Sequence, residues 1–136
     1  MPKVFTSETQ RIGEIGENIA TKFLVKQGFL IKERNYTKKW GELDIIAEKN
    51  NKIYFIEVKS VTRDNLVSVS HETLDSYKPE DNMHSWKLKR LSRTIQTYLL
   101  NRNIDEDKEW QFDLFVVFLD LKNKKAKIKV VEDIVL

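Results

Sequence analysis

The segment GELDIIAEKNNKIYFIEVKS, residues 41–60, carries charged side chains of types that do chemistry, on strands that are otherwise apolar. Asp44 lies just before one apolar run, and Glu57 and Lys59 interrupt the next. A buried charge is costly unless it is paired or binds a metal ion. These three residues therefore mark either a functional site or a set of ion pairs.

The turn between the two strands predicts how they pair. The Asn-Asn pair at 50–51 tolerates left-handed backbone geometry and favours a hairpin turn. Counting back from that turn, Asp44 faces Glu57. On the same terms Glu42 faces Lys59. Because strand side chains alternate, we expect all four to project from one face, at the end of the hairpin away from its turn.

Two facing carboxylates favour a divalent cation between them. Side chains paired across strands have Cβ atoms about 4.5–5.5 Å apart, so Asp44 and Glu57 would repel each other. Mg²⁺ prefers oxygen ligands and is typically held by one or two carboxylates together with a substrate phosphate. Lys59 would lie beside that phosphate, where it could orient the water or stabilise developing negative charge. The set indicates metal-assisted phosphodiester hydrolysis.

A structural interpretation of the same residues stays open. A Glu-x-Lys triplet on a strand is common as a solvated ion pair. Asp44 could cap a turn after Gly41, and Glu42 could form an ordinary cross-strand salt bridge with Lys59.

The elements that must position these residues follow from the periodicity of apolar side chains. The pattern predicts an α/β protein with the order helix, three strands, helix, two strands. The expected helices cover residues 8–27 and about 81–101, and the expected strands lie within 29–36, 42–60, 110–121 and 125–135. Residues 61–80 are expected to form a long, partly mobile loop. The strand at 110–121 is nearly all apolar, which predicts a central position in the sheet.

Each helix has an expected packing face. In the first helix we expect Ser7 to be the N-cap, and Gly13, Gly16 and Ala20 to be thin positions where the helix approaches a sheet. The second helix has six side chains predicted to face the core: Met83, Trp86, Leu91, Ile95, Tyr98 and Leu99.

Composition sets further bounds. The 136 residues suit a single domain spanning 1–136, and the net charge of +3 with a pI near 9.0 is compatible with a polyanionic partner. Cysteine is absent, which excludes disulfides, thiolate metal sites and a thiol nucleophile. With no apolar run long enough to span a bilayer and no leader pattern, we expect a cytoplasmic protein without a membrane partner.

Several segments together resemble a known family. Residues 41–47 and 55–59 resemble the PD-(D/E)XK nuclease superfamily, and specifically the small UPF0102 (YraN-like) family, which looks related to archaeal Holliday junction resolvases. The Gly-Glu-x-x-Ala pattern beginning at Gly16, the segment WKLKRLSRTIQTYLL and the strand QFDLFVV are similar to further family segments, in the same order. The resemblance covers nearly the whole chain apart from residues 61–80.

The resemblance implies a restriction-endonuclease-like fold, in which a mixed central β-sheet of about five strands is flanked by helices. It implies Mg²⁺ or Mn²⁺ at Asp44 and Glu57, with the Val58 carbonyl completing the ligand set and Lys59 as the catalytic lysine. It also implies that Glu17 reaches the metal site from the first helix as an accessory acid. Related resolvases work as dimers, so a homodimer is expected.

The second helix is basic, which is compatible with contacts to nucleic-acid phosphates and equally with a solvated helix face. Lys87, Lys89, Arg90 and Arg93 lie on this helix, and Trp40 could stack on a base, although aromatic residues entering a sheet are usually core. From sequence alone Lys87 is a lysine whose stem lies near the core. The resemblance makes it a site candidate.

The leading hypothesis is a metal-dependent endonuclease that acts on DNA, including branched or otherwise structured DNA. One alternative is a catalytically inactive nucleic-acid-binding module with the same fold. Another is a protein-interaction domain in which the charged residues form only ion pairs. The chain departs from the family pattern in two places. Where the family usually has Thr-Arg after the lysine, this chain has Ser60 and Val61. The loop that follows is longer than the family pattern leads us to expect, and if it shapes substrate access, substrate preference does not carry over.

Overall fold

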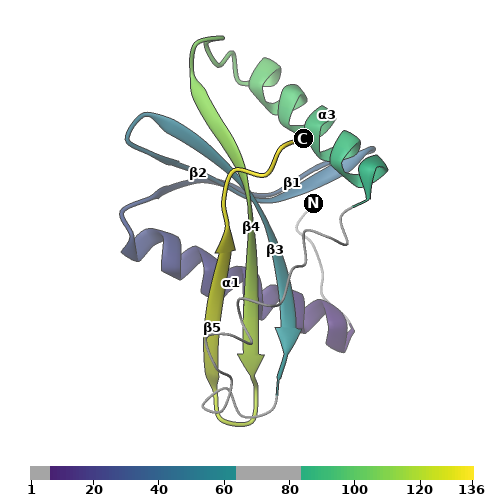
Figure 1. Cartoon of the computed structure of the whole chain (residues 1–136), viewed down its shortest axis with the longest axis vertical. Coiled ribbons are helices and arrows are strands. Elements are labelled where there is room, and N and C mark those ends of the chain that lie inside the picture. Colours follow the sequence, from purple (N-terminus) through teal and green to yellow (C-terminus); the bar gives the residue numbers. More distant parts are fainter. Residues whose placement is uncertain (1–6, 64–83) are drawn as a thin grey trace.

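The computed structural model describes residues 7–63 and 84–136. They form two helices and five strands (Figure 1). The bounds are α1 Glu8–Lys26, β1 Leu30–Lys38, β2 Gly41–Lys49, β3 Lys52–Thr62, α3 Ser85–Asn101, β4 Glu109–Asp120 and β5 Lys125–Val131. The element order and the α/β class predicted from the sequence are confirmed.

The five strands form one mixed sheet in the order β1-β2-β3-β4-β5. Neighbouring strands are antiparallel except β3 and β4, which are parallel. A parallel pair needs a crossover, and α3 lies between these two strands in the chain. In Figure 1, β1 and β2 turn sideways while β3, β4 and β5 continue downward together. This divergence positions the candidate site.

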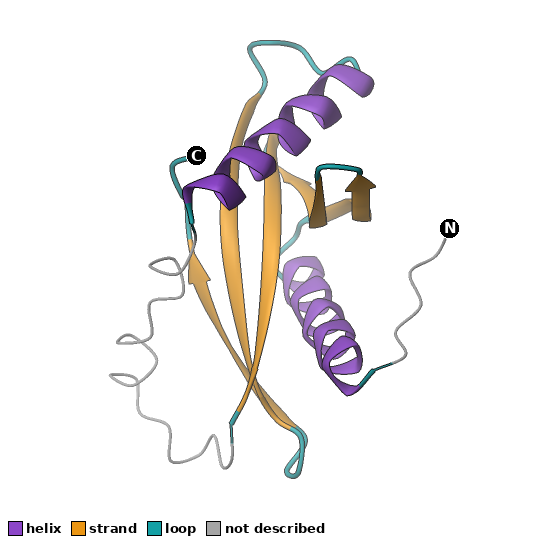
Figure 2. Cartoon of the chain, turned by 90° about the vertical axis from the view of Figure 1, so that its right-hand side faces the viewer, coloured by secondary structure: helices purple, strands orange, loops and turns teal. Residues whose placement is uncertain are grey.

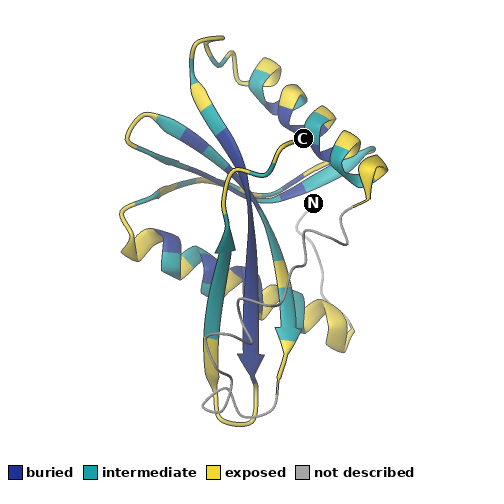
Figure 3. Cartoon of the chain, viewed as in Figure 1, coloured by how far each residue is buried: buried dark blue, intermediate teal, exposed yellow. Residues whose placement is uncertain are grey.

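The two helices pack in two different core clusters. Figure 2 shows α1 and α3 as separate layers beside the sheet. Residues of α3 such as Leu91 and Ile95 pack with Leu43 and Phe55 on one face. Ala20 and Leu24 of α1 belong to the cluster on the other face, which includes the following sheet residues: Ile45, Ala47, Ile56, Phe115, Val117 and Leu119. The β4 strand is buried along nearly its whole length (Figure 3), as its apolar sequence predicts.

Local signals in the sequence place the helix start and the hairpin turn. Ser7 is the N-cap of α1 and forms a reciprocal capping box with Gln10. Asn50 and Asn51 have φ angles of +51° and +62°, in the left-handed region that the predicted turn requires. The strands pair from Lys49 opposite Lys52 up to Ile45 opposite Ile56, in the register that the turn predicts.

Some packing expectations were wrong. Trp86 is 54% exposed, because only the side of α3 that carries Leu91 and Ile95 meets the sheet. A Cβ on Gly13 would meet nothing within 4 Å, so this glycine is not a thin position, whereas Gly16 packs directly against Ser60.

The second helix begins later than predicted, at Ser85 after its N-cap His84. Residues 81–83, where the predicted helix begins, lie outside the described residues. So do Met83 and most of the predicted 61–80 loop, although β3 itself extends to Thr62.

Candidate metal and nucleic-acid site

The site lies where β2 and β3 separate. Their ladder ends at Ile45 and Ile56, after which β2 continues to pair with β1 as far as Gly41, and β3 continues with β4 as far as Thr62. Beyond Ile56, therefore, one edge of β3 has lost its backbone partner. Backbone N–H groups that leave a ladder need other acceptors.

The Asp44 side chain supplies one such acceptor. The Val58 N–H donates to Asp44 Oδ2 at 2.8 Å, so a carboxylate replaces the missing backbone carbonyl of β2. The N–H and C=O of one strand residue point to the same edge, so the Val58 carbonyl also points into the opening between the strands. The separation of the strands thus brings a carboxylate and a backbone carbonyl to one place.

Acidic side chains from α1 and β3 act on Asp44 of β2 here. Burial raises the pKa of Asp44 from 3.8 to about 8, against the lowering effect of the Val58 N–H. The charge of Glu17, a hydrogen bond with its carboxyl group and the charge of Glu57 raise this pKa further. Glu17 is itself only 5% exposed, on the buried side of α1. The site is thus an acidic cluster whose negative charges are unfavourable together without a cation.

Asn35 of β1 is a member of this cluster that sequence reasoning missed. When its amide is oriented by its hydrogen bonds, its nitrogen donates to Glu42 Oε1 at 3.2 Å and to Glu17 Oε1 at 3.3 Å. Its φ of +54° is in the left-handed region, which Asn tolerates better than most residues. An asparagine in the middle of a strand was the available signal.

Glu57 is held from the other helix. Lys87 Nζ of α3 lies 2.9 Å from Glu57 Oε1, and the Lys87 side chain is 42% exposed. Glu57 Oε2 is buried and has no hydrogen-bond partner among the described residues. In the structure the Lys87 ammonium pairs with an acidic residue of the site, and its contact with a phosphate stays a prediction.

The predicted side chains approach the opening from two directions. Val58 packs in the α1-side cluster and Ser60 faces Gly16, so alternation places Glu57 and Lys59 on the α3 side. Asp44, in contrast, hydrogen-bonds with Glu17 of α1. Simple alternation predicted one shared face. The predicted pairs Asp44–Glu57 and Glu42–Lys59 lie beyond the end of the ladder, because β2 turns away from β3 after Ile45 and Ile56 (Figure 1). The charges of Glu17 and Glu57 nevertheless both act on Asp44.

The donor set fits a hard divalent cation. Among the described residues no group of three or more His, Asp or Glu side chains could by itself hold a metal ion. Mg²⁺ does not need one, since it commonly keeps several waters and uses one or two carboxylates. The unpartnered Glu57 Oε2, the Asp44 carboxylate and the Val58 carbonyl are oxygen donors of the right kind. Lys59 is exposed on β3, two residues beyond Glu57.

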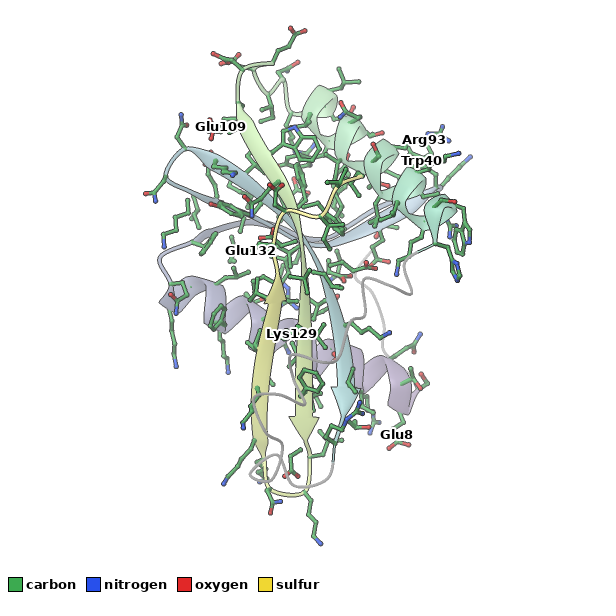
Figure 4. The ribbon with its side chains drawn as sticks, viewed as in Figure 1. Glu8, Trp40, Arg93, Glu109, Lys129 and Glu132 are labelled. Atoms are coloured by element: carbon green, nitrogen blue, oxygen red, sulfur yellow. The ribbon has the colours of Figure 1, made fainter. Side chains whose placement is uncertain are left out.

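The predicted nucleic-acid residues gather beside this opening, on the first half of α3. The Arg90 guanidinium lies 4.2 Å from the centre of the Trp86 ring, and that of Arg93 lies 4.0 Å from the Trp40 ring. Figure 4 shows Arg93 and Trp40 together at α3. Lys89 is exposed on the same helix. Trp40 is partly buried, so it is neither a pure core residue nor a fully exposed one.

The described residues form an α/β protein with a five-stranded mixed sheet and two helices. This architecture is consistent with a restriction-endonuclease-like fold. More specifically, the chain belongs to the family described as "Uncharacterised protein family UPF0102", whose model matches residues 16–117. This confirms the resemblance found in the sequence.

Several relatives carry the same family name. A UPF0102 protein of Campylobacter fetus is 35% identical over 119 residues, which is 88% of each chain. One of Campylobacter jejuni is 38% identical over 80% of this chain and 85% of its own. One of Clostridium botulinum is 34% identical over 90% of this chain and 91% of its own. Neither α1 nor α3, the helices of the described part, is long and apolar enough to cross a membrane.

Proposed function

We propose that this protein is a metal-dependent endonuclease that hydrolyses phosphodiester bonds in DNA, using Mg²⁺ or Mn²⁺. The observation that carries the proposal is the acidic cluster at the β2–β3 opening, where the pKa of Asp44 is raised to about 8 and Glu57 Oε2 is buried without a partner. A cluster of this kind has a physical reason to exist when a cation offsets its charge.

Asp44, Glu57 and the Val58 carbonyl would hold the metal ion, and Glu17 would act as an accessory acid through water. When bound, such an ion polarises a phosphoryl oxygen and lowers the pKa of a coordinated water. Glu17 and Asn35 fix the orientation of the acidic side chains, because Asn35 donates to Glu17 and Glu17 hydrogen-bonds with Asp44.

Lys59 would serve as the catalytic lysine. It follows Glu57 by two residues on β3 and so lies on the same side of that strand. From there its ammonium would contact the attacked phosphate, orient the water and stabilise the negative charge that develops in the transition state. Lys87 supplies a second ammonium at the same opening.

The basic residues of α3 support a nucleic-acid substrate. Lys89, Arg90 and Arg93 would neutralise phosphates beside the site, and this contribution to affinity falls as salt concentration rises. A branched junction offers two symmetric cutting positions, so a homodimer would supply the two sites that paired cuts require.

The test is a cleavage panel on linear duplex, single-stranded and four-way-junction DNA, with Mg²⁺, Mn²⁺ or EDTA. We expect cleavage that needs the metal ion and is abolished by Asp44→Ala and by Lys59→Ala, while DNA binding is largely kept. Glu14→Ala is the matched control, since Glu14 is an exposed acid on α1, three residues before Glu17.

Binding without cleavage on every substrate would overturn the endonuclease and leave the non-cleaving binding module. Cleavage that survives both Asp44→Ala and Lys59→Ala would point to a contaminating nuclease. A sedimentation measurement with and without junction DNA tests the homodimer separately.

A further inference from the structure

Trp86 is a tryptophan on a side of α3 that does not meet the sheet, so the core does not use its ring. It is 54% exposed in the first turn of α3, although burying a tryptophan is among the most favourable contributions to a core. His84, the N-cap residue, lies beside it with the two rings 6.3 Å apart and nearly parallel at 9°. Arg90 covers its ring from the next turn.

Trp86 belongs to a continuous surface of aromatic rings and guanidinium groups. Residues 86, 90 and 93 recur at helical spacing and so share one side of α3. Trp40 joins this side from the turn before β2, because the adjacent Gly41 packs closely on α3. We call Trp86, Arg90, Arg93 and Trp40 the Trp–Arg stripe.

The stripe adjoins the acidic cluster. Lys87 follows Trp86 directly in the chain, and its Nζ lies 2.9 Å from Glu57 Oε1. The first turn of α3 therefore carries both Trp86 of the stripe and the lysine that contacts Glu57.

We propose that the Trp–Arg stripe binds unpaired nucleotides, so that the substrate class of this protein is DNA with single-stranded bases beside the cut rather than fully paired duplex. The assignment of a cut rests on the endonuclease function proposed above, but the binding itself does not. The exposed ring of Trp86 can stack on any base, since every base has a π-face, and Arg90 and Arg93 can neutralise the neighbouring phosphates. In a continuous duplex those π-faces are covered by neighbouring base pairs.

The occupant follows from the chemistry of the stripe. A lipid surface or an apolar peptide would not require two guanidinium groups lying over indole rings. A purely electrostatic contact with duplex phosphates would not require an exposed tryptophan. The combination of stacking surface and positive charge is typical of proteins that bind single strands.

The experiment measures fluorescence anisotropy of a labelled oligothymidylate and of a labelled blunt duplex, in EDTA so that no hydrolysis occurs. We expect Trp86→Ala to weaken binding of the oligothymidylate by roughly fivefold to a hundredfold, the range given by loss of one base–aromatic stack. Binding of the duplex should change by less than about twofold, because it depends on phosphate contacts. Trp86→Phe keeps an aromatic ring and should restore most of the affinity for the single strand.

Leu100→Ala is the matched control. Leu100 is a large apolar residue on the same helix, 77% exposed and about two turns beyond Arg93, the last stripe residue on α3. Its substitution should change neither affinity. The inference is overturned when Trp86→Ala leaves oligothymidylate binding unchanged, or weakens single-strand and duplex binding equally.

The outcomes separate this inference from the endonuclease proposal. If the protein binds single strands in a Trp86-dependent way but never cuts DNA, binding by the Trp–Arg stripe is supported and only the endonuclease proposal is overturned. If the protein cleaves DNA in a metal-dependent way but its affinity for single strands does not depend on Trp86, only the inference about the Trp–Arg stripe is overturned.

Discussion

Asp44→Asn should make the metal-free protein more stable at neutral pH. The pKa of Asp44 rises from 3.8 to about 8 in the folded protein because the side chain is buried beside Glu17 and Glu57. The folded state therefore binds more protons than the unfolded state between these two values. Stability falls as pH rises through this window, because the unfolded chain ionises Asp44 freely and the folded chain does not.

The size of the effect follows from the shift. In the unfolded chain the pKa of Asp44 is 3.8, so pH 7 lies about three units above it. Each unit of difference in pKa corresponds to about 1.36 kcal/mol. The cost to the folded state is thus at most about 4 kcal/mol, and about 2–4 kcal/mol once partial exposure and the response of neighbouring groups are included. An asparagine carries no such cost, still accepts from the Val58 N–H and can donate to Glu17.

The assay is urea unfolding followed by circular dichroism in EDTA, from pH 4.5 to pH 8. We expect Asp44→Asn to exceed the wild type by about 2–4 kcal/mol at pH 7 and by less than about 1 kcal/mol at pH 4.5. Adding Mg²⁺ or Mn²⁺ should stabilise the wild type more than the variant, since ligand binding to the folded state adds stability.

Glu48→Gln is the control of opposite sign. Glu48 lies on the same strand, but a hydrogen bond from Lys108 lowers its pKa. The stability that this pairing contributes is present above the ordinary pKa of a glutamate and is lost as pH falls. The variant should therefore be slightly less stable than the wild type at pH 7. Parallel stability curves for wild type and Asp44→Asn across this pH range would refute the reasoning.

Two further predictions concern the surroundings of the cluster. Lys87→Met should tighten binding of Mn²⁺ or Mg²⁺ roughly fivefold by calorimetry, because a unit charge about 4 Å away contributes about 1 kcal/mol when well solvated; the ammonium now lies 2.9 Å from Glu57 Oε1. Gly16→Ala should destabilise the fold by about 1–2 kcal/mol in thermal or urea unfolding, since its Cβ would lie 1.8 Å from Ser60 Oγ and 3.0 Å from Ser60 Cβ.

Each has a control in the same helix. Lys89→Met removes an exposed charge from α3 that has no contact with Glu57, and should leave metal affinity unchanged. Gly13→Ala should stabilise by about 0.5–1 kcal/mol through helix propensity, because nothing lies within 4 Å of its added Cβ. Equal metal affinities for both lysine variants, or equal stability changes for both glycine variants, would contradict the respective argument.

The sequence alone determined the features that depend on neighbouring residues. The Asn-Asn turn fixed the hairpin register from Lys49 opposite Lys52 to Ile45 opposite Ile56. Apolar periodicity placed the helices and strands, since each buries one face whose spacing is set by its own geometry. Asp44 and Glu57 could be singled out for the same reason, as charges within apolar strands. Glu17 became a site candidate through the UPF0102 resemblance. Its position on the border of a helix face would not have singled it out.

The tertiary structure decided how these groups meet. The ladder between β2 and β3 stops because β3 follows β4 while β2 follows β1, and only this separation lets Asp44 accept from the Val58 N–H. Lys87 reaches Glu57 across 30 residues of sequence because two elements pack together. Trp86 follows a helical pattern that would also suit the core, yet it is exposed because α3 presents its other side to the sheet. Periodicity gives the face of one element, but which face is buried depends on what packs against it.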